Sequence, residues 1–84
     1  GILESYAGDY RLAPNFILTI SLDGDHLKAS ATGQPEFPIF ASSETEFFWK
    51  VVDAQLTFNR DADGNVISLT LHQNGADVTG SRVE

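Results

Sequence analysis

The chain lacks cysteine and has few basic residues, and each shortage excludes a class of protein. Without cysteine among its 84 residues there is no disulfide, no thiolate nucleophile and no Cys-ligated zinc. Five Lys and Arg against twelve Asp and Glu give a net charge of −7, which opposes binding to nucleic acid and to anionic membrane surfaces. No apolar run approaches the ~20 residues that cross a bilayer, and no signal peptide is recognisable.

Methionine is also missing, including an initiator. We therefore expect a processed protein or a domain cut from a longer chain. A length of 84 residues predicts one domain, residues 1–84, whose apolar side chains go mostly into a single core.

Apolar and polar residues alternate most clearly in the stretch 55–75, which predicts two strands of a hairpin. The sequence Asp-Ala-Asp-Gly between the strands predicts a four-residue loop that pairs Phe58 with Ile67. The following Asn-Gly predicts a type I′ turn that pairs Leu71 with Val78, because both turn residues tolerate positive φ. All four apolar side chains then lie on one face of the sheet.

The rest of the chain predicts further short strands joined by tight turns. A Gly-Asp turn pairs Leu22 with Leu27. The full set is a helical turn at 2–6 and strands at 8–12, 16–22, 27–32, 36–41, 46–52, 55–59, 67–72 and 76–83. Sequential antiparallel neighbours favour an eight-stranded up-and-down barrel, lipocalin-like in form, because closure removes exposed edges. A two-sheet β-sandwich is the alternative.

The alternation also predicts which aromatic rings face inward: Tyr10, Phe16, Phe40, Phe47, Trp49 and Phe58. So much ring volume favours a filled interior. In the alternative of a hollow barrel, the interior contacts of an apolar ligand are predicted to be Tyr10, Phe47, Trp49 and Phe58.

Outward-facing apolar residues are predicted on two neighbouring strands: Phe37, Ile39, Phe48 and Val52. A contiguous group of four would mark a docking surface. The assignment depends on the register of the strand that contains Pro38, because a slip of one residue turns half of the group inward.

Candidate catalytic and metal-binding residues are few. The predicted register places Asp53, His72 and Asp77 side by side on the outer face, where a solvated charge cluster is the favoured interpretation. Asp23 to His26 is interpreted as a hairpin turn. Motifs such as Ser-x-x-Lys, Gly-x-Ser-x-Gly and His-Glu-x-x-His do not occur in the sequence. We therefore expect no enzyme activity, no cofactor and no metal.

Several short motifs, spread over essentially the whole chain, resemble those of a known family. They are Leu3-x-x-Tyr6-x-Gly8-x-Tyr10, Thr32-Gly33-Gln34-Pro35, Phe47 before Asp53-Ala54, and Phe58-x-Arg60-Asp61-x-x-Gly64-x-Val66-x-x-Leu69-x-Leu71-x-Gln73-Asn74-Gly75. The pattern resembles a domain of unknown function found C-terminal to catalytic domains of the serine β-lactamase and penicillin-binding-protein type. These motifs consist of turn and core residues and carry no activity.

The resemblance implies a lipocalin-like barrel that serves as an accessory module to a bacterial or archaeal serine hydrolase or peptidase. The partner implied is an upstream or separate catalytic domain, which would contain the Ser-x-x-Lys motif. A periplasmic or extracellular location is an expectation from the resemblance. The alternative function is a free-standing barrel that binds a small apolar ligand.

Overall fold

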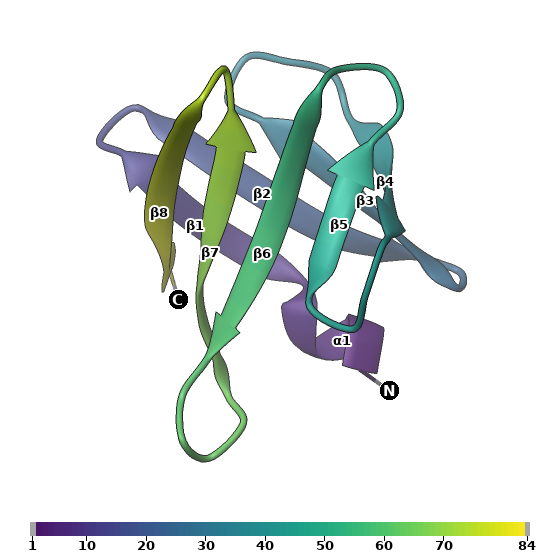
Figure 1. Ribbon diagram of the computed structural model, residues 1–84, viewed down its shortest axis with the longest axis vertical. Helices are drawn as coiled ribbons and strands as arrows, with labels where there is room; N and C mark the ends of the chain where they lie inside the picture. Colours follow the sequence, from purple (N-terminus) through teal and green to yellow (C-terminus); the bar gives the residue numbers. More distant parts are fainter. Residues whose placement is uncertain (1, 84) are drawn as a thin grey trace.

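The computed structural model describes residues 2–83; residues 1 and 84, the two ends of the predicted domain, lie outside the described residues. A short helix and eight strands follow in order: α1 (Ile2–Tyr6), β1 (Gly8–Ala13), β2 (Phe16–Asp23), β3 (His26–Ala31), β4 (Phe37–Ala41), β5 (Glu46–Trp49), β6 (Ala54–Arg60), β7 (Val66–Gln73) and β8 (Ala76–Val83). Each strand pairs antiparallel with the next, and β8 returns to pair with β1 (Figure 1). The predicted up-and-down barrel with its N-terminal helical turn is confirmed, and the sandwich alternative is wrong.

Two hairpins have the register that their turn residues predict. Leu22 pairs with Leu27 across the β2–β3 turn. Leu71 pairs with Val78 across the β7–β8 turn, where Asn74 and the glycine after it have φ of 55° and 76°. These values suit a type I′ turn, so the local chemistry of the turn residues fixed the pairing.

The β6–β7 hairpin differs from its predicted register by two residues. Phe58 pairs with Leu69 rather than with Ile67, and a register shift follows Asn59. The irregularity puts Val66 into the core at 6% exposure and leaves Ile67 49% exposed. An extra residue in one strand shifts every pairing beyond it, which alternation alone does not reveal.

The register of β4 and β5 also differs from the prediction. Ile39 pairs with Leu27 on one side and Trp49 on the other and is 1% exposed, so its predicted outward orientation is wrong. Phe40, predicted to face inward, instead pairs with Phe48 on the outer face. Because β4 has apolar residues at both alternating positions, its sequence does not distinguish the two faces.

Strand β5 is shorter than predicted, since it ends at Trp49 and the chain then bends through residues 50–53. Val51, which lies within the predicted strand 46–52, is 57% exposed in this bend. The bend brings the chain back into β6 at Ala54, which is buried.

The two ends of the barrel differ. Helix α1 covers one end, which we call the closed end, and β8 finishes beside the start of β1 at that same end (Figure 1). Tyr6 of α1 is 0% exposed, stacks on Phe58 with ring centroids 4.1 Å apart, and meets Phe47 edge-on at 5.7 Å. The Tyr10 hydroxyl donates to the Tyr6 carbonyl oxygen at 2.8 Å. The aromatic core therefore fills the closed end.

Candidate functional site

The opposite end of the barrel, the open end, contains an apolar cavity of about 140 Å³. It lies among the turns and loops that join β1 to β2, β3 to β4, β5 to β6 and β7 to β8. Its lining residues are Phe16, Leu18, Ala29, Ala31, Gln34, Pro35, Phe37, Trp49, Val52, Ala54, Leu71 and Gln73. We call this space the open-end cavity.

Small side chains explain why space remains here. Ala29, Ala31 and Ala54 occupy inward positions on β3 and at the start of β6, where the closed half of the barrel has rings and branched side chains. Close packing leaves few voids in protein interiors, so an apolar cavity of this size at a barrel mouth is a candidate binding site.

The structure divides the residues predicted to contact an interior ligand. Trp49 lines the open-end cavity and is half-buried. Tyr10, Phe47 and Phe58 are 0%, 3% and 2% exposed and belong to the aromatic core at the closed end. The interior is thus filled in one half and hollow in the other.

The structure also divides the predicted docking patch. Phe37 and Val52 lie at the mouth of the open-end cavity, 36% and 47% exposed. Ile39 is in the core, and Phe48 lies on the outer face with its ring centroid 5.9 Å from that of Phe40. The four residues therefore do not form one surface, but two of them flank the candidate site.

Sequence reasoning missed most of the lining. Phe16 was expected to face inward but not to line a site, and no role in a site was predicted for the alanines of β3. The available signal was a row of alanines that shares an inner face with an isolated tryptophan, since small residues opposite a large ring leave unfilled volume. The loop residues Gln34 and Pro35 belong to a motif of the family resemblance, but nothing in that motif or in the hydrophobic alternation indicates that they line a site.

On the outer face, His72 lies between a hydroxyl and a carboxylate. Its Nε2 is 2.9 Å from the Thr57 hydroxyl and its Nδ1 is 2.7 Å from Oδ1 of Asp77. Asp53 lines the same shallow hollow and accepts a 3.5 Å hydrogen bond from Gln55.

The order hydroxyl, imidazole, carboxylate is that of a nucleophile, base and orienting group. Acyl transfer also needs free N–H donors for an oxyanion. Here the neighbouring strands β6, β7 and β8 pair with one another through their backbone ladders. The cluster is therefore a hydrogen-bonded sheet surface.

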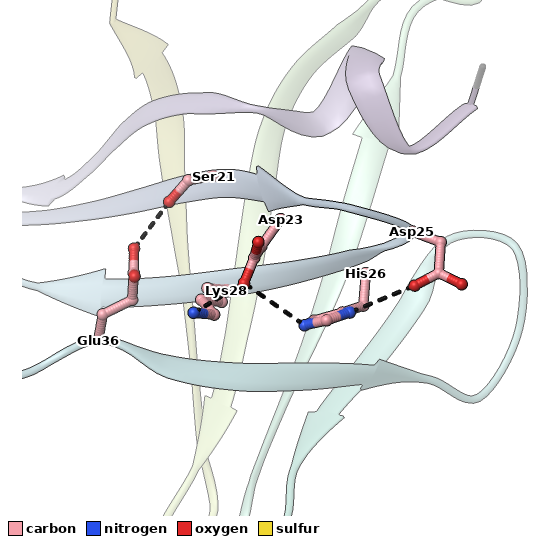
Figure 2. A network of polar contacts seen from close by, with 6 residues as sticks. All are labelled: Ser21, Asp23, Asp25, His26, Lys28 and Glu36. Carbon is pink, nitrogen blue, oxygen red and sulfur yellow. Dashed lines mark hydrogen bonds and ion pairs between the residues drawn. The ribbon is translucent and has the colours of Figure 1, made fainter.

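A second polar cluster follows the β2–β3 hairpin (Figure 2). Lys28 Nζ is 2.8 Å from Oδ2 of Asp23, and this hydrogen bond lowers the pKa of Asp23 and raises the pKa of Lys28. His26 lies 3.8 Å from Asp23 and 3.4 Å from Asp25. Within residues 2–83 no group of three or more His, Asp or Glu side chains has the arrangement of a metal site. This cluster is an exposed ion-pair network at a turn.

Comparison with known proteins gives one match. Over residues 1–82 the chain matches the family described as "Domain of unknown function (DUF3471)". The chain belongs to this family. No curated protein and no solved structure matches the chain.

The family match confirms the resemblance to a domain of unknown function, and this DUF3471 domain is a small closed β-barrel. Its position after a β-lactamase-like catalytic domain stays a prediction. In the described part of this DUF3471 domain, no helix has the length and apolar character needed to span a membrane.

Proposed function

We propose that this DUF3471 domain is a non-catalytic accessory domain of a β-lactamase-like serine hydrolase or peptidase, and that it docks through the open end of its barrel. The observation that carries the proposal is the open-end cavity with Phe37 and Val52 exposed at its mouth. The hydrolase is suggested by the resemblance of the chain, and the docking surface by its geometry.

The mouth suits docking because apolar surface is exposed around a concave site. Interfaces are typically anchored by a few residues that become fully desolvated at the centre. Helix α1 and the last residues of β8 lie at the closed end, opposite the open-end cavity (Figure 1).

The structure supports an accessory role rather than a catalytic one. The open-end cavity is lined by apolar side chains and two glutamines, with no acid, base or nucleophile among them. The His72 cluster lies on a sheet face whose backbone amides are engaged in strand pairing. Catalysis would accordingly belong to the partner.

A free-standing barrel that binds a small apolar ligand is the second candidate. The apolar lining of the open-end cavity favours it, with Phe16, Trp49 and Leu71 among the walls. We rank ligand binding below the accessory role because the cavity has a volume of about 140 Å³, whereas sites for small molecules and cofactors typically occupy ~300–1,000 Å³. Only a fragment-sized molecule fits.

Two adjacent valines provide a matched test. Val51 and Val52 are both exposed in the β5–β6 bend, at 57% and 47%, but only Val52 lines the cavity. The measurement is the affinity of this domain for the purified catalytic domain of a β-lactamase-like serine hydrolase encoded with it. Val52→Asp should weaken binding about ten-fold or more, whereas Val51→Asp, which adds the same charge, should leave it unchanged.

Two results would oppose the proposal. If the wild-type domain does not bind the catalytic domain, the proposed accessory role is refuted. If both aspartate variants bind equally well, and circular dichroism shows that both fold as the wild type does, the open end is not the docking surface.

A further inference from the structure

We infer that the open-end cavity receives one uncharged aromatic side chain presented by the docking partner. This inference rests on the proposed function, since it specifies what the partner inserts. It depends on the ring contacts of the cavity, on its volume and on its lack of charged side chains.

The aromatic rings of the molecule fall into two groups. The rings that pair with another ring at 4.1–5.9 Å are Tyr6, Tyr10, Phe40, Phe47, Phe48 and Phe58. The remaining three, Phe16, Phe37 and Trp49, pair with no other ring in the described chain, and all three line the open-end cavity. Aromatic rings gain from edge and offset contacts with one another. An inserted ring would supply the contact that these three lack.

The volume admits one ring and little more. A cavity of about 150 Å³ lined by apolar side chains can hold benzene, as an engineered cavity in another protein does. The open-end cavity has about 140 Å³. A long alkyl chain or a fused polycyclic ligand exceeds this space, whereas a phenyl or phenol ring matches it.

The polar groups of the lining indicate a neutral occupant. No charged side chain lines the cavity, so burying an ion there would lack a compensating partner. Gln34 and Gln73 are exposed, and their side-chain amides and the Trp49 indole N–H reach solvent at the cavity without a hydrogen bond to another group of residues 2–83. They can bond to a phenolic hydroxyl or to the peptide groups that carry an inserted ring.

The exposed mouth favours a ring attached to a protein over a free small molecule. A single ring inside the cavity leaves the outer surfaces of Phe37 and Val52, now 36% and 47% exposed, in contact with water. A polypeptide that carries the ring would cover both. Burying this apolar surface adds to the affinity only when the ring belongs to a larger partner.

The chain contains a single tryptophan, Trp49, which makes it a specific reporter of the cavity. The test follows its fluorescence and its indole N–H resonance in a proton–nitrogen correlation spectrum. The probes are N-acetyl-phenylalaninamide, N-acetyl-leucinamide and p-cresol, and the competitor is the hydrolase catalytic domain.

We expect N-acetyl-phenylalaninamide to bind saturably with a dissociation constant on the order of 1 mM, as suits so few buried atoms. N-acetyl-leucinamide should bind about five-fold more weakly because it makes no ring contacts. Ala31→Leu should abolish binding by filling the cavity, since the half-buried Ala31 lines it. Ala62→Leu, in the exposed β6–β7 loop at the closed end, is the matched control and should bind as the wild type does.

The outcomes distinguish this inference from the proposed function. Competition between the phenylalanine probe and the catalytic domain, with loss of both in Ala31→Leu, supports the inference. No response of Trp49 to any aromatic probe overturns it, even if the catalytic domain still binds and the accessory role stands. Binding of p-cresol without binding of the phenylalanine probe also overturns it, because the occupant is then a free molecule. If the Ala31→Leu variant binds the catalytic domain as tightly as the wild type does, the inserted aromatic side chain is overturned as well.

Discussion

Tyr6 should contribute more to stability than any other residue of α1. It is 0% exposed, and its ring stacks on Phe58 and meets Phe47 edge-on. Its hydroxyl donates to the backbone oxygen of Glu44 at 2.7 Å and accepts a hydrogen bond from Arg60. One side chain thus joins the helix to the core, to the β4–β5 loop and to the end of β6.

The magnitudes follow from these contacts. Tyr6→Phe keeps the ring and removes the hydroxyl with its two hydrogen bonds, so the free energy of unfolding should fall by about 1–3 kcal/mol, at about 0.5–1.5 kcal/mol for each bond. Tyr6→Ala also removes the buried ring and should cost about 3–5 kcal/mol. At ~0.05–0.15 kcal/mol per residue, a chain of 84 residues has about 4–13 kcal/mol in total. The alanine variant should therefore lose a large part of its stability.

Denaturant unfolding followed by circular dichroism measures both changes. Ile67→Ala is a suitable control, because Ile67 is 49% exposed and should cost less than about 1 kcal/mol. If Tyr6→Ala is no less stable than this control, the Tyr6 ring does not stabilise the closed end as its contacts indicate. Equal stability of Tyr6→Phe and the wild type would refute the contribution of the hydroxyl alone.

Three further predictions concern the barrel as a whole. Gly80→Ala should lower the free energy of unfolding by about 1–3 kcal/mol, because a Cβ at this position would lie 2.7 Å from the carbonyl oxygen of Arg11. The same variant should raise the rate of amide hydrogen exchange along β1 and β8. An unchanged exchange rate would contradict the close approach of the two strands. Burial raises the pKa of Tyr10 above its ordinary value of 10.0, so the native state holds its proton longer and the free energy of unfolding should fall as pH rises above that value. Tyr10→Phe should flatten this alkaline decline in denaturant unfolding, and an equally steep decline would contradict it. A backbone hydrogen bond from Asn65 lowers the pKa of Asp61 below 3.8, so its stabilisation is present above that pH and lost as pH falls through the lower native value. Asp61→Ala should therefore show a smaller loss of stability on acidification, and a loss as large as that of the wild type would oppose the assignment.

The fold could be predicted where local chemistry determines geometry. The β7–β8 register followed from Asn74 and the glycine after it, because few residues other than these two types adopt the positive φ of such a turn. The β2–β3 register, with Leu22 opposite Leu27, followed from its turn in the same way. Eight such strands with short connections leave a closed meander as the simplest arrangement.

Prediction failed where tertiary packing decides between two locally equal choices. In β4 both Ile39 and Phe40 are apolar, and only the pairing with Leu27 on β3 places Ile39 inside. In β6 the irregularity after Asn59 shifts the pairing by two residues, and nothing in the alternation marks it. Errors of one or two residues in register are enough to reverse which side chains face a site.

The candidate site was correspondingly the part least accessible to sequence reasoning. Trp49 was placed inside the barrel correctly, but its neighbours in the cavity depend on the β3–β4 loop and the β5–β6 bend. Val52 was assigned to an outer face because β5 was expected to continue past residue 49. The early end of the strand turns that residue to the mouth instead.

We propose the open end of the barrel as the binding surface of this DUF3471 domain. The most direct test is to titrate the isotope-labelled domain with the hydrolase catalytic domain and to follow the indole N–H resonance of Trp49. We expect this resonance to shift progressively while the backbone resonances of Phe40 and Phe48 on the outer face stay in place. Binding that shifts the outer-face resonances and leaves the Trp49 resonance unchanged would contradict docking at the open end.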